Sequence, residues 1–370
     1  MVNLAGIVHL STVHRTRDNR IYNKECGALL DAGYQCVLVV RGERDEPGPV
    51  AIRALPTPAN RLIRLTTMQL RAWRELDRLK PRLVHIHDPE LIPLAWLWSR
   101  LRGALCVFDA HEDLVKQIAT KRYLKPWQRT AARLYARLLT CWADRGMDAV
   151  VAATGPIAEG FSNPRTIVVH NYPWLRDFQA TPAPVPGRMV YTGDLTEERK
   201  LSFMVDLVHL VRQRVPSAHL VLAGAVVGEA ARRVASSSFD GELVKHLGLL
   251  PPSDVPAVIS SAQLGLILLE PLPNYLTSLP TKLFEYQAAG VPFVASDFPH
   301  WRATFGEQAG VFIDSEDLVA SADVVGELVQ NPERCRGLGR NGRAAVEVAH
   351  NFEHEAEKLV GLMRELGLVP

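Results

Sequence analysis

In the segment from Ser278 to Ser296, the residue types predict that a helix starts near Pro280, and Lys282 lies in its first turn. Pro280 is favoured in a first helical turn, and the hydroxyl of Ser278 or Thr281 is suited to cap the helix start. The free N–H groups at a helix start attract anions, so Lys282 is unfavourable there unless it meets a bound anion. The pattern therefore predicts an anion site at Thr281 and Lys282.

Glu285 follows Lys282 by three residues, which places both side chains on one side of the predicted helix. A carboxylate beside a phosphate site is suited to bond the diol of a ribose. The alternative for this pair is an ordinary solvated Lys–Glu contact.

A second pair of cations, Arg199 and Lys200, follows the apolar run 187–193 and opens the next helical stretch. The chain has no Asp-x-Asp pair, a common holder of a divalent ion, so cationic side chains would have to stabilise a departing anion. The alternative is a solvated helix start.

His111 ends the apolar run 104–110 and is followed by Glu112 and Asp113. At the end of a buried strand its imidazole is placed to meet a ligand, and the alternative is a histidine that only caps the strand. His85, His87 and Asp88 lie at the end of another such run. With Asp109, His111, Glu112 and Asp113 they offer a second alternative, a metal site of the kind found in hydrolases.

The elements that carry these residues alternate between apolar runs and helical periods. Runs rich in β-branched residues are typical of strands buried on both faces of a parallel sheet, and the alternation predicts βαβ units. We expect strands at 4–11, 35–40, 50–55, 83–87, 104–110, 149–153, 166–170, 187–193, 219–225, 243–248, 264–270, 291–297 and 309–314. We expect helices at 20–32, 60–80, 89–102, 126–145, 200–214, 253–262, 280–289, 316–330 and 333–348.

The segment 178–187 has three prolines and no charge, which is typical of an extended linker. The sequence therefore predicts two doubly wound α/β domains, 1–180 and 181–352, with a cleft between the carboxyl ends of their strands.

Several segments, in order along the chain, resemble the retaining glycosyltransferases of family 4, which have the GT-B fold. The most specific is PTKLFEYQAAGVPFVASD (280–297), which is similar to the donor-site helix and the strand after it. Weaker matches are VHIHD (84–88), FDAHE (108–112), VHNYP (169–173), YTGDL (191–195) with Arg199 and Lys200, and NFEHE (351–355).

The resemblance implies a role for each matching residue. The diphosphate of a nucleotide-sugar donor would meet Arg199, Lys200, Thr281 and Lys282, with Glu285 on the ribose. The backbone around Gly248 and Leu249 would bind the base, and His111 would be the catalytic residue. His87, Asp88, Thr277 and Ser278 would contact the donor sugar or the acceptor. The resemblance implies no metal and no cofactor, an acceptor-binding first domain, and a last helix, 353–370, that returns to that domain.

Two positions depart from the family pattern. Thr277 stands where these enzymes have a glutamate that touches the donor sugar, and the segment 11–20 replaces their Gly-Gly loop. The donor sugar and the acceptor are therefore not assigned from the resemblance.

Composition limits the partners and the compartment. Residues 1–180 carry 26 Lys and Arg against 17 Asp and Glu, whereas the rest of the chain carries 16 against 23. The basic segment 115–142 interleaves aromatic and leucine side chains and suits an anionic membrane surface, with a solvated helix face as the alternative. Its cations are Lys116, Lys121, Arg122, Lys125, Arg129, Arg133 and Arg137. An acidic second half argues against nucleic acid.

We expect a cytoplasmic protein, with peripheral contact to the inner membrane face as an option. The five scattered cysteines indicate buried thiols, and no secretory leader or apolar span is evident.

The resulting hypothesis is a retaining, metal-independent hexosyltransferase that uses a UDP- or GDP-sugar. Its acceptor would be a glycan, a lipid-linked molecule or a small molecule. Two alternatives stay open. One is a metal-dependent hydrolase built on the HxHD cluster, and the other is a binding module that holds a nucleotide sugar without reaction, which the missing acid at Thr277 suggests.

Overall fold

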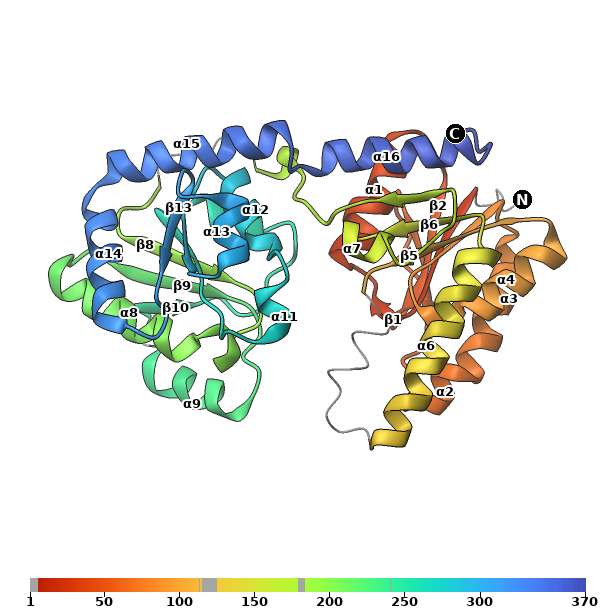
Figure 1. Ribbon diagram of the computed structural model, residues 1–370, viewed down its shortest axis with the longest axis horizontal. Coiled ribbons are helices and arrows are strands. Elements are labelled where there is room, and N and C mark those ends of the chain that lie inside the picture. Colours follow the sequence, from red (N-terminus) through yellow and green to blue (C-terminus); the bar gives the residue numbers. More distant parts are fainter. Residues whose placement is uncertain (1–5, 113, 115–124, 179–183, 240) are drawn as a thin grey trace. The chain divides into compact units, whose positions relative to one another are not determined.

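The computed structural model describes residues 6–112, 114, 125–178, 184–239 and 241–370. The chain forms two compact units. Unit 1 comprises Met1–Asn171 with Glu353–Pro370, and unit 2 comprises Tyr172–Phe352. Each unit is a sheet with helices packed on its faces (Figure 1), which confirms the predicted α/β class.

The sheet of unit 1 has seven strands in the order β3-β2-β1-β4-β5-β6-β7, and all of its neighbours run parallel. An order that grows outward from β1 in both directions places a topological switch point between β1 and β4, where open α/β sheets bind ligands. The strands are β1 (Ile7–Arg15), β2 (Cys36–Arg41), β3 (Ala51–Leu55), β4 (Leu83–Ile86), β5 (Leu105–Ala110), β6 (Ala149–Ala152) and β7 (Thr166–Val168).

The helices of unit 1 cover both faces of this sheet. They are the π-helix η1 (Asn19–Cys26), the 3₁₀ turn η2 (Pro89–Leu91), α1 (Gly27–Asp31), α2 (Arg61–Leu65), α3 (Thr67–Leu79), α4 (Ile92–Arg102), α6 (Pro126–Gly146), α7 (Gly155–Ala158) and all but the first residue of α16 (Phe352–Glu365). The chain after α16 is held on unit 1, because the Tyr34 hydroxyl donates to the Leu368 carbonyl at 3.2 Å.

The sheet of unit 2 has six parallel strands in the order β10-β9-β8-β11-β12-β13. They are β8 (Arg188–Thr192), β9 (His219–Ala223), β10 (Val244–His246), β11 (Leu264–Ile267), β12 (Phe293–Ser296) and β13 (Gly310–Ile313). The helical elements are η3 (Leu175–Asp177), η4 (Glu197–Arg199), α8 (Leu201–Arg214), α9 (Glu229–Ser238), α10 (Val255–Ser260), α11 (Pro273–Leu276), α12 (Thr281–Ala288), α13 (Pro299–Phe305), α14 (Leu318–Gln330) and α15 (Pro332–Val348).

One side chain fixes α12 on this sheet. Tyr286 is fully buried, and its hydroxyl donates to the Leu266 carbonyl of β11 at 2.8 Å. Its ring lies over Gly265, where a Cβ would come within 2.6 Å of the ring carbons. The glycine in the strand therefore allows the helix that carries Lys282 and Glu285 to approach the sheet closely.

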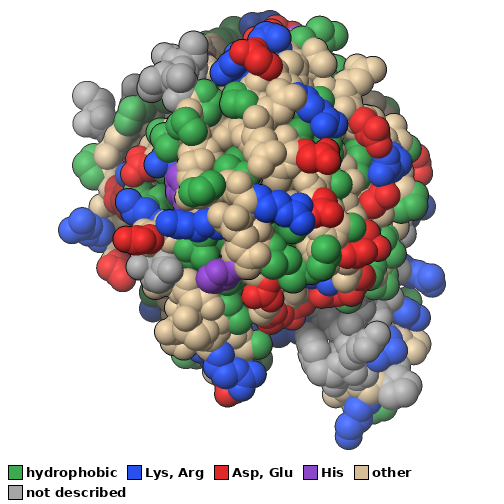
Figure 2. All heavy atoms as spheres, turned by 90° about the vertical axis from the view of Figure 1, so that its left-hand side faces the viewer, with side chains coloured by type: hydrophobic (Ala, Val, Ile, Leu, Met, Phe, Trp, Pro, Cys, Tyr) green, Lys and Arg blue, Asp and Glu red, His purple; other side chains and the backbone are tan. Residues whose placement is uncertain are grey.

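The surface of unit 2 seen in Figure 2 mixes acidic and basic side chains with small apolar areas. No helix among the described residues is long and apolar enough to cross a membrane. Four of the five cysteines are buried, as expected, but Cys141 is exposed on α6, because that position lies on the outer face of the helix.

Candidate functional site

Three strands of unit 2 end in glycines that lie next to one another. Gly193 follows β8, Gly224 follows β9 and Gly248 lies two residues after β10. The Gly193 N–H donates to the Ala223 carbonyl at 2.7 Å, and the Gly224 N–H donates to the Gly248 carbonyl at 2.8 Å. All three have positive φ angles (126°, 148° and 72°), which other residues rarely adopt. At the carboxyl ends of β8, β9 and β10 the sheet therefore presents backbone without side chains at these three positions.

Two cations converge on the first of these turns. A Cβ on Gly193 would lie 2.8 Å from Cε of Lys282, 3.0 Å from its Nζ and 3.2 Å from a terminal guanidinium nitrogen of Arg199. Lys282 comes from the first turn of α12 and Arg199 from the end of η4. The structure thus brings together two of the predicted anion ligands, although 83 positions separate them in the sequence.

These two cations lack carboxylate partners. Among the described residues, neither forms an ion pair within 4.0 Å. Arg199 donates to the Tyr191 hydroxyl and the Asp194 carbonyl, both at 3.4 Å, and also interacts with Tyr275. Burial, with the nearby Arg199 charge, lowers the pKa of Lys282 from its ordinary value. Glu285 and Asp194 lie near enough to act on the Lys282 charge, but neither forms a direct ion pair with it. Two adjacent cations that no described carboxylate pairs directly form a site suited to a polyanion such as a diphosphate.

Lys200 has a different environment. It adopts a left-handed conformation (φ 54°) and is only 8% exposed. Its ammonium pairs with Glu270 at 2.9 Å and also with Glu316. Its charge is therefore already balanced within the protein, unlike that of Arg199.

The start of α12 differs from the prediction in one respect. Neither Ser278 nor Thr281 caps the helix, because Pro280 occupies the N-cap position and has no side-chain acceptor. The Ser278 carbonyl accepts instead from Nε1 of Trp301 at 2.7 Å, and the Thr277 hydroxyl donates to the Pro273 carbonyl at 3.2 Å. Both side chains are exposed.

Glu285 lies one turn into α12 and is half-buried. Glu285 and Lys282, both described, form no ion pair within 4.0 Å, but the Glu285 charge acts on Lys282 and raises its pKa against the larger effect of burial. Leu249, beside Gly248, is 73% exposed and leaves that turn open to a ligand.

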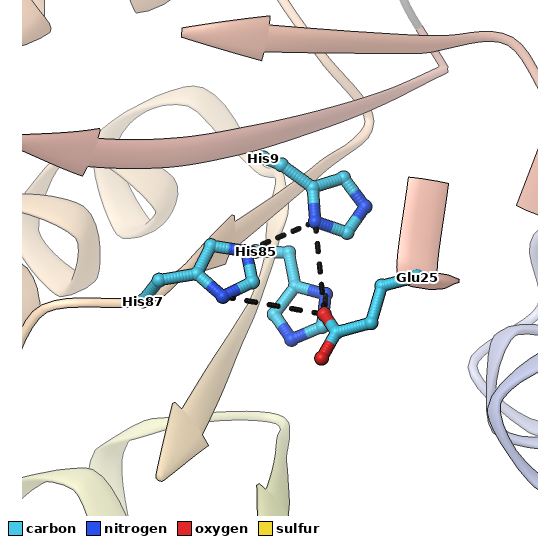
Figure 3. Close-up of side chains that lie close together, drawn as sticks. All are labelled: His9, Glu25, His85 and His87. Carbon is cyan, nitrogen blue, oxygen red and sulfur yellow. Dashed lines mark hydrogen bonds and ion pairs between the residues drawn. The ribbon is translucent and has the colours of Figure 1, made fainter. Parts of the chain in front are cut away.

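In unit 1 the polar residues of three neighbouring strands are buried together. His9 lies in β1 opposite His85 in β4, and His87 follows that strand. These imidazoles meet Glu25 of η1 in the interior of the unit (Figure 3), and all four side chains are at most 2% exposed. Burial lowers the pKa of His9 and of His85 well below its usual range, so both imidazoles are neutral.

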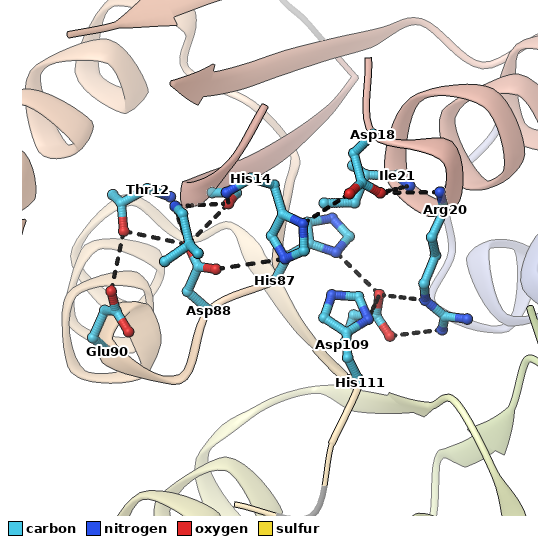
Figure 4. A network of polar contacts seen from close by, with 12 residues as sticks. Thr12, His14, Asp18, Arg20, Ile21, His87, Asp88, Glu90, Asp109 and His111 are labelled. Carbon is cyan, nitrogen blue, oxygen red and sulfur yellow. Dashed lines mark hydrogen bonds and ion pairs between the residues drawn. The ribbon is translucent and has the colours of Figure 1, made fainter. Parts of the chain in front are cut away.

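Asp88 holds the last part of β1. Its carboxylate accepts hydrogen bonds from the Ser11 hydroxyl at 3.0 Å and from the N–H groups of Thr12 and Val13 (Figure 4). All of these bonds go to Oδ2 of Asp88. Asp88 therefore ties the residue after β4 to the last part of β1.

Asp109 connects the buried residues to His111 (Figure 4). Arg20 binds it through two nitrogens, at 2.8 and 3.1 Å, and Nδ1 of His87 lies 3.0 Å from it. Burial alone would raise the pKa of Asp109, but the Arg20 charge holds it well below its usual range. The carboxylate is therefore a fixed negative charge that orients the surrounding donors.

His111 lies beside this carboxylate, with Nδ1 3.3 Å from Oδ2 of Asp109. Burial lowers the pKa of His111 to about 4, so its imidazole is neutral at physiological pH. Nε2 has no hydrogen-bond partner among the described residues. This nitrogen is available to a ligand hydroxyl.

A pocket of about 640 Å³ in unit 1 is lined by these groups. Its polar lining includes His111, His87, Asp88 and Glu90, and α6 adds apolar side chains that include Tyr135. The volume and the mixed lining suit a small molecule or one end of a larger one.

The basic segment is described only in part. Lys116, Lys121 and Arg122 lie outside the described residues. On α6, exposed apolar side chains alternate with the exposed Arg133 and Arg137. These apolar residues are Trp127 (68% exposed), Leu134 (59%), Tyr135 (51%) and Leu138 (59%).

Sequence reasoning missed several residues of these sites. Gly193 lies in the matched segment 191–195 but was given no role of its own. Gly224 had a usable signal, because the apolar runs GRMVYTG, HLVLAG and LVKHLG all end in glycine. Arg20, Glu25 and His9 gave no signal on their own, since their partners lie on other elements of the sheet.

Two family models match the chain. The family described as "Glycosyltransferase Family 4" matches residues 24–171, and the family described as "Glycosyl transferase-like" matches residues 199–361. No curated protein sequence matches at a significant level.

Solved structures share the fold across nearly the whole chain. A sucrose-phosphate synthase from Thermosynechococcus elongatus is 20% identical with a TM-score of 0.70, over 97% of this chain and 98% of that one. HepE from Anabaena, solved in complex with UDP-glucose, is 13% identical with a TM-score of 0.67, over 97% and 99%. The Escherichia coli protein named "Trehalose-6-phosphate", bound with UDP-2-fluoro glucose, is 12% identical with a TM-score of 0.64, over 98% and 99%.

Proposed function

Because the chain belongs to the GT-B glycosyltransferases, we propose that it transfers a hexose from a UDP- or GDP-sugar with retention of anomeric configuration and without a catalytic metal ion. The acceptor would be a glycan, a lipid-linked molecule or a small molecule. The observation that carries the proposal is the convergence of Arg199 and Lys282 on the bare backbone of Gly193.

In this proposal unit 2 holds the nucleotide. Arg199 and Lys282 bind the diphosphate and stabilise the negative charge that grows as the glycosidic bond to the phosphate breaks, which is the task of a metal ion in other enzymes. Thr281 is the first residue of α12, and its backbone N–H would donate to the same diphosphate. Glu285 accepts hydrogen bonds from the ribose diol, and Gly248 and Leu249 bound the space for the base.

Unit 1 supplies the sugar- and acceptor-side groups. The neutral His111, held by Asp109, presents Nε2 to a sugar hydroxyl, and His87 and Asp88 line the same pocket. Thr277 and Ser278 are exposed in unit 2 and are candidates for contacts with the sugar. We expect UDP-glucose to be the first donor to test, since two of the structurally similar proteins were solved with UDP-glucose or its fluorinated analogue.

The test has two parts, both performed in excess EDTA. UDP-, GDP- and dTDP-sugars are screened for a shift in melting temperature and for release of the nucleoside diphosphate. Proton NMR of the product then reports the anomeric configuration. Absence of binding and turnover for every donor would refute the proposal, and a product of inverted configuration would refute retention.

One observation favours the binding-module alternative. Thr277 is a hydroxyl residue whose side chain donates to the Pro273 carbonyl, at the position of the glutamate of related enzymes. A protein that binds UDP-glucose but releases no UDP in a single turnover, with any acceptor, would be such a module.

We also propose that α6 brings the protein to an anionic membrane surface. Exposed arginines contribute about 1 kcal/mol each near anionic lipid, and the exposed Trp127 and Leu134 would enter the interface. Co-flotation with vesicles of anionic and of neutral lipid tests this, with a double Arg133→Glu, Arg137→Glu variant as control. Equal recovery of wild type with both vesicles would contradict it.

A further inference from the structure

Three imidazoles and one carboxylate in the interior of unit 1 share a small volume. The ligand atoms of His9, Glu25, His85 and His87 all lie within 4.8 Å of one another. The four side chains come from β1, η1, β4 and the residue after β4, and the strand register places His9 directly opposite His85. Figure 3 shows the imidazoles and the Glu25 carboxylate grouped together.

The hydrogen-bonding capacity of this group is filled only in part. Nδ1 of His9 and Nε2 of His87 share one hydrogen bond at 3.0 Å, and Oε1 of Glu25 pairs with Arg20. Within the described part of the chain, neither ring nitrogen of His85 has a hydrogen-bond partner, and neither has Oε2 of Glu25. That oxygen lies 4.0, 3.9 and 4.0 Å from Nδ1 of His9, His85 and His87, distances too long for hydrogen bonds. Buried polar atoms are rarely left without a partner, so the centre of the group is suited to a bound species.

The donor set identifies that species. Imidazole nitrogens with one carboxylate oxygen are typical zinc ligands, and donors on one tetrahedral zinc ion lie about 3.4 Å apart for bonds of about 2.0–2.2 Å. Nδ1 of His9 and Nε2 of His87, now hydrogen-bonded at 3.0 Å, would give up that bond and separate slightly to bind the ion. Ligand atoms as far apart as 4.8 Å would have to move inward by up to about 0.9 Å.

The surroundings fit the same conclusion. Nδ1 of His87 lies 3.0 Å from Oδ2 of Asp109, which leaves Nε2 as the ligating atom. A carboxylate behind a metal-bound histidine is a recurring arrangement at zinc sites. Among the described residues, Arg20 bonds both carboxylates: its Nε lies 3.0 Å from Oε1 of Glu25, and a terminal nitrogen lies 2.8 Å from Oδ1 of Asp109. Oε2 of Glu25 is left to face the three imidazoles.

We propose that His9, Glu25, His85 and His87 bind one zinc ion that joins β1, β4 and η1. Because these side chains are at most 2% exposed, the ion would not contact a substrate, and its role would be to hold His87 and Asp88 in place at the pocket. This set differs from the metal cluster expected from sequence. Asp88 is not part of the group, and its Oδ2 is bonded to Ser11 and Thr12 of β1. The inference does not depend on the proposed transfer reaction.

The experiment is metal analysis of the full-length protein purified without chelator. We expect about one zinc per chain, and X-ray absorption at the zinc edge should show nitrogen and oxygen ligands with imidazole scattering. His85→Ala and Glu25→Gln should lower the zinc content at least fivefold. His111→Ala, which removes a ligand from the neighbouring group of His87, Asp109 and His111, should retain it.

Two results would overturn the proposal. One is wild-type protein with less than a tenth of an equivalent of any divalent metal, also after refolding with zinc and desalting. The other is zinc that is lost with His111→Ala but kept with His85→Ala, which would place it in the neighbouring group. If the variants fail to fold, the metal content and absorption spectrum of the wild type still decide the question.

Discussion

Replacement of Gly193 by alanine tests the donor site directly. The new methyl group would lie 2.8 Å from Cε of Lys282 and 3.0 Å from its Nζ, which is closer than van der Waals contact allows. Because the end of the Lys282 side chain is flexible, it would adopt another rotamer at a small packing cost. Its ammonium group would then no longer lie beside Gly193. Loss of one charge-assisted contact costs about 1.5–3 kcal/mol, which is about a 10- to 150-fold weaker affinity for UDP.

The same substitution also strains the backbone, because φ at Gly193 is 126°. Such strain destabilises the folded state by about 1–3 kcal/mol whatever the surroundings. Gly228→Ala is the matched control. Its φ of 92° carries similar strain, but a Cβ there meets nothing within 4 Å. We expect both variants to lose stability and only Gly193→Ala to lose UDP affinity.

Calorimetric titration with UDP in EDTA measures the affinity, and urea unfolding measures the stability of both variants. The reasoning is refuted if folded Gly193→Ala binds UDP as tightly as wild type. It is also refuted if Gly228→Ala weakens binding to the same degree, since the effect would then come from strain alone.

Three further predictions follow from individual side chains. Glu285→Gln should weaken both uridine and UDP binding, whereas Lys282→Ala should weaken UDP binding only. Calorimetric titration with both ligands separates the two roles, and the same loss of uridine and UDP affinity in both variants would contradict the assignment. Arg199→Ala should lower UDP affinity more than Lys200→Ala, because the Lys200 charge is already paired with Glu270 and Glu316. A larger loss of UDP affinity in Lys200→Ala would contradict this assignment. His111 has a folded pKa of about 4 against 6.5 unfolded, so its contribution to stability is complete above pH 6.5 and is lost as the pH falls toward 4. When the pH falls from 7 to 4.5, the free energy of unfolding of the wild type, measured with urea, should drop by about 2–3 kcal/mol more than that of His111→Gln. Equal drops would show that the imidazole is not held neutral.

The strands were predictable because each is buried on both faces and leaves an uninterrupted apolar run in the sequence. Helix details were less so. The predicted helix 60–80 is two helices, α2 and α3, which separate at Thr66. The predicted helix 20–32 begins as a π-helix, in which Asp18 accepts from the N–H groups of Arg20 and Ile21. The short helices α9 and α13 gave no apolar period long enough to predict.

The donor-site residues were predictable in part because they are close in sequence to helix and strand ends. Lys282 and Glu285 lie on one helix, and only the approach of Lys282 to Gly193 required the structure. The network around Asp109 was not predictable, because Arg20 lies 89 positions away and the sequence does not distinguish a buried arginine from an exposed one. Long-range pairing of this kind depends on strand order, which the sequence pattern does not specify.

The measurement that tests the central claim most directly is release of UDP from UDP-glucose in excess EDTA, compared between wild type and Lys282→Ala. We predict release by the wild type that EDTA does not inhibit, and a rate at least tenfold lower in the folded variant. Equal rates for both proteins would contradict the assignment of the diphosphate to Lys282. No release from UDP-, GDP- or dTDP-sugars by the wild type would contradict the claim that the protein is a glycosyltransferase with an active donor site in unit 2.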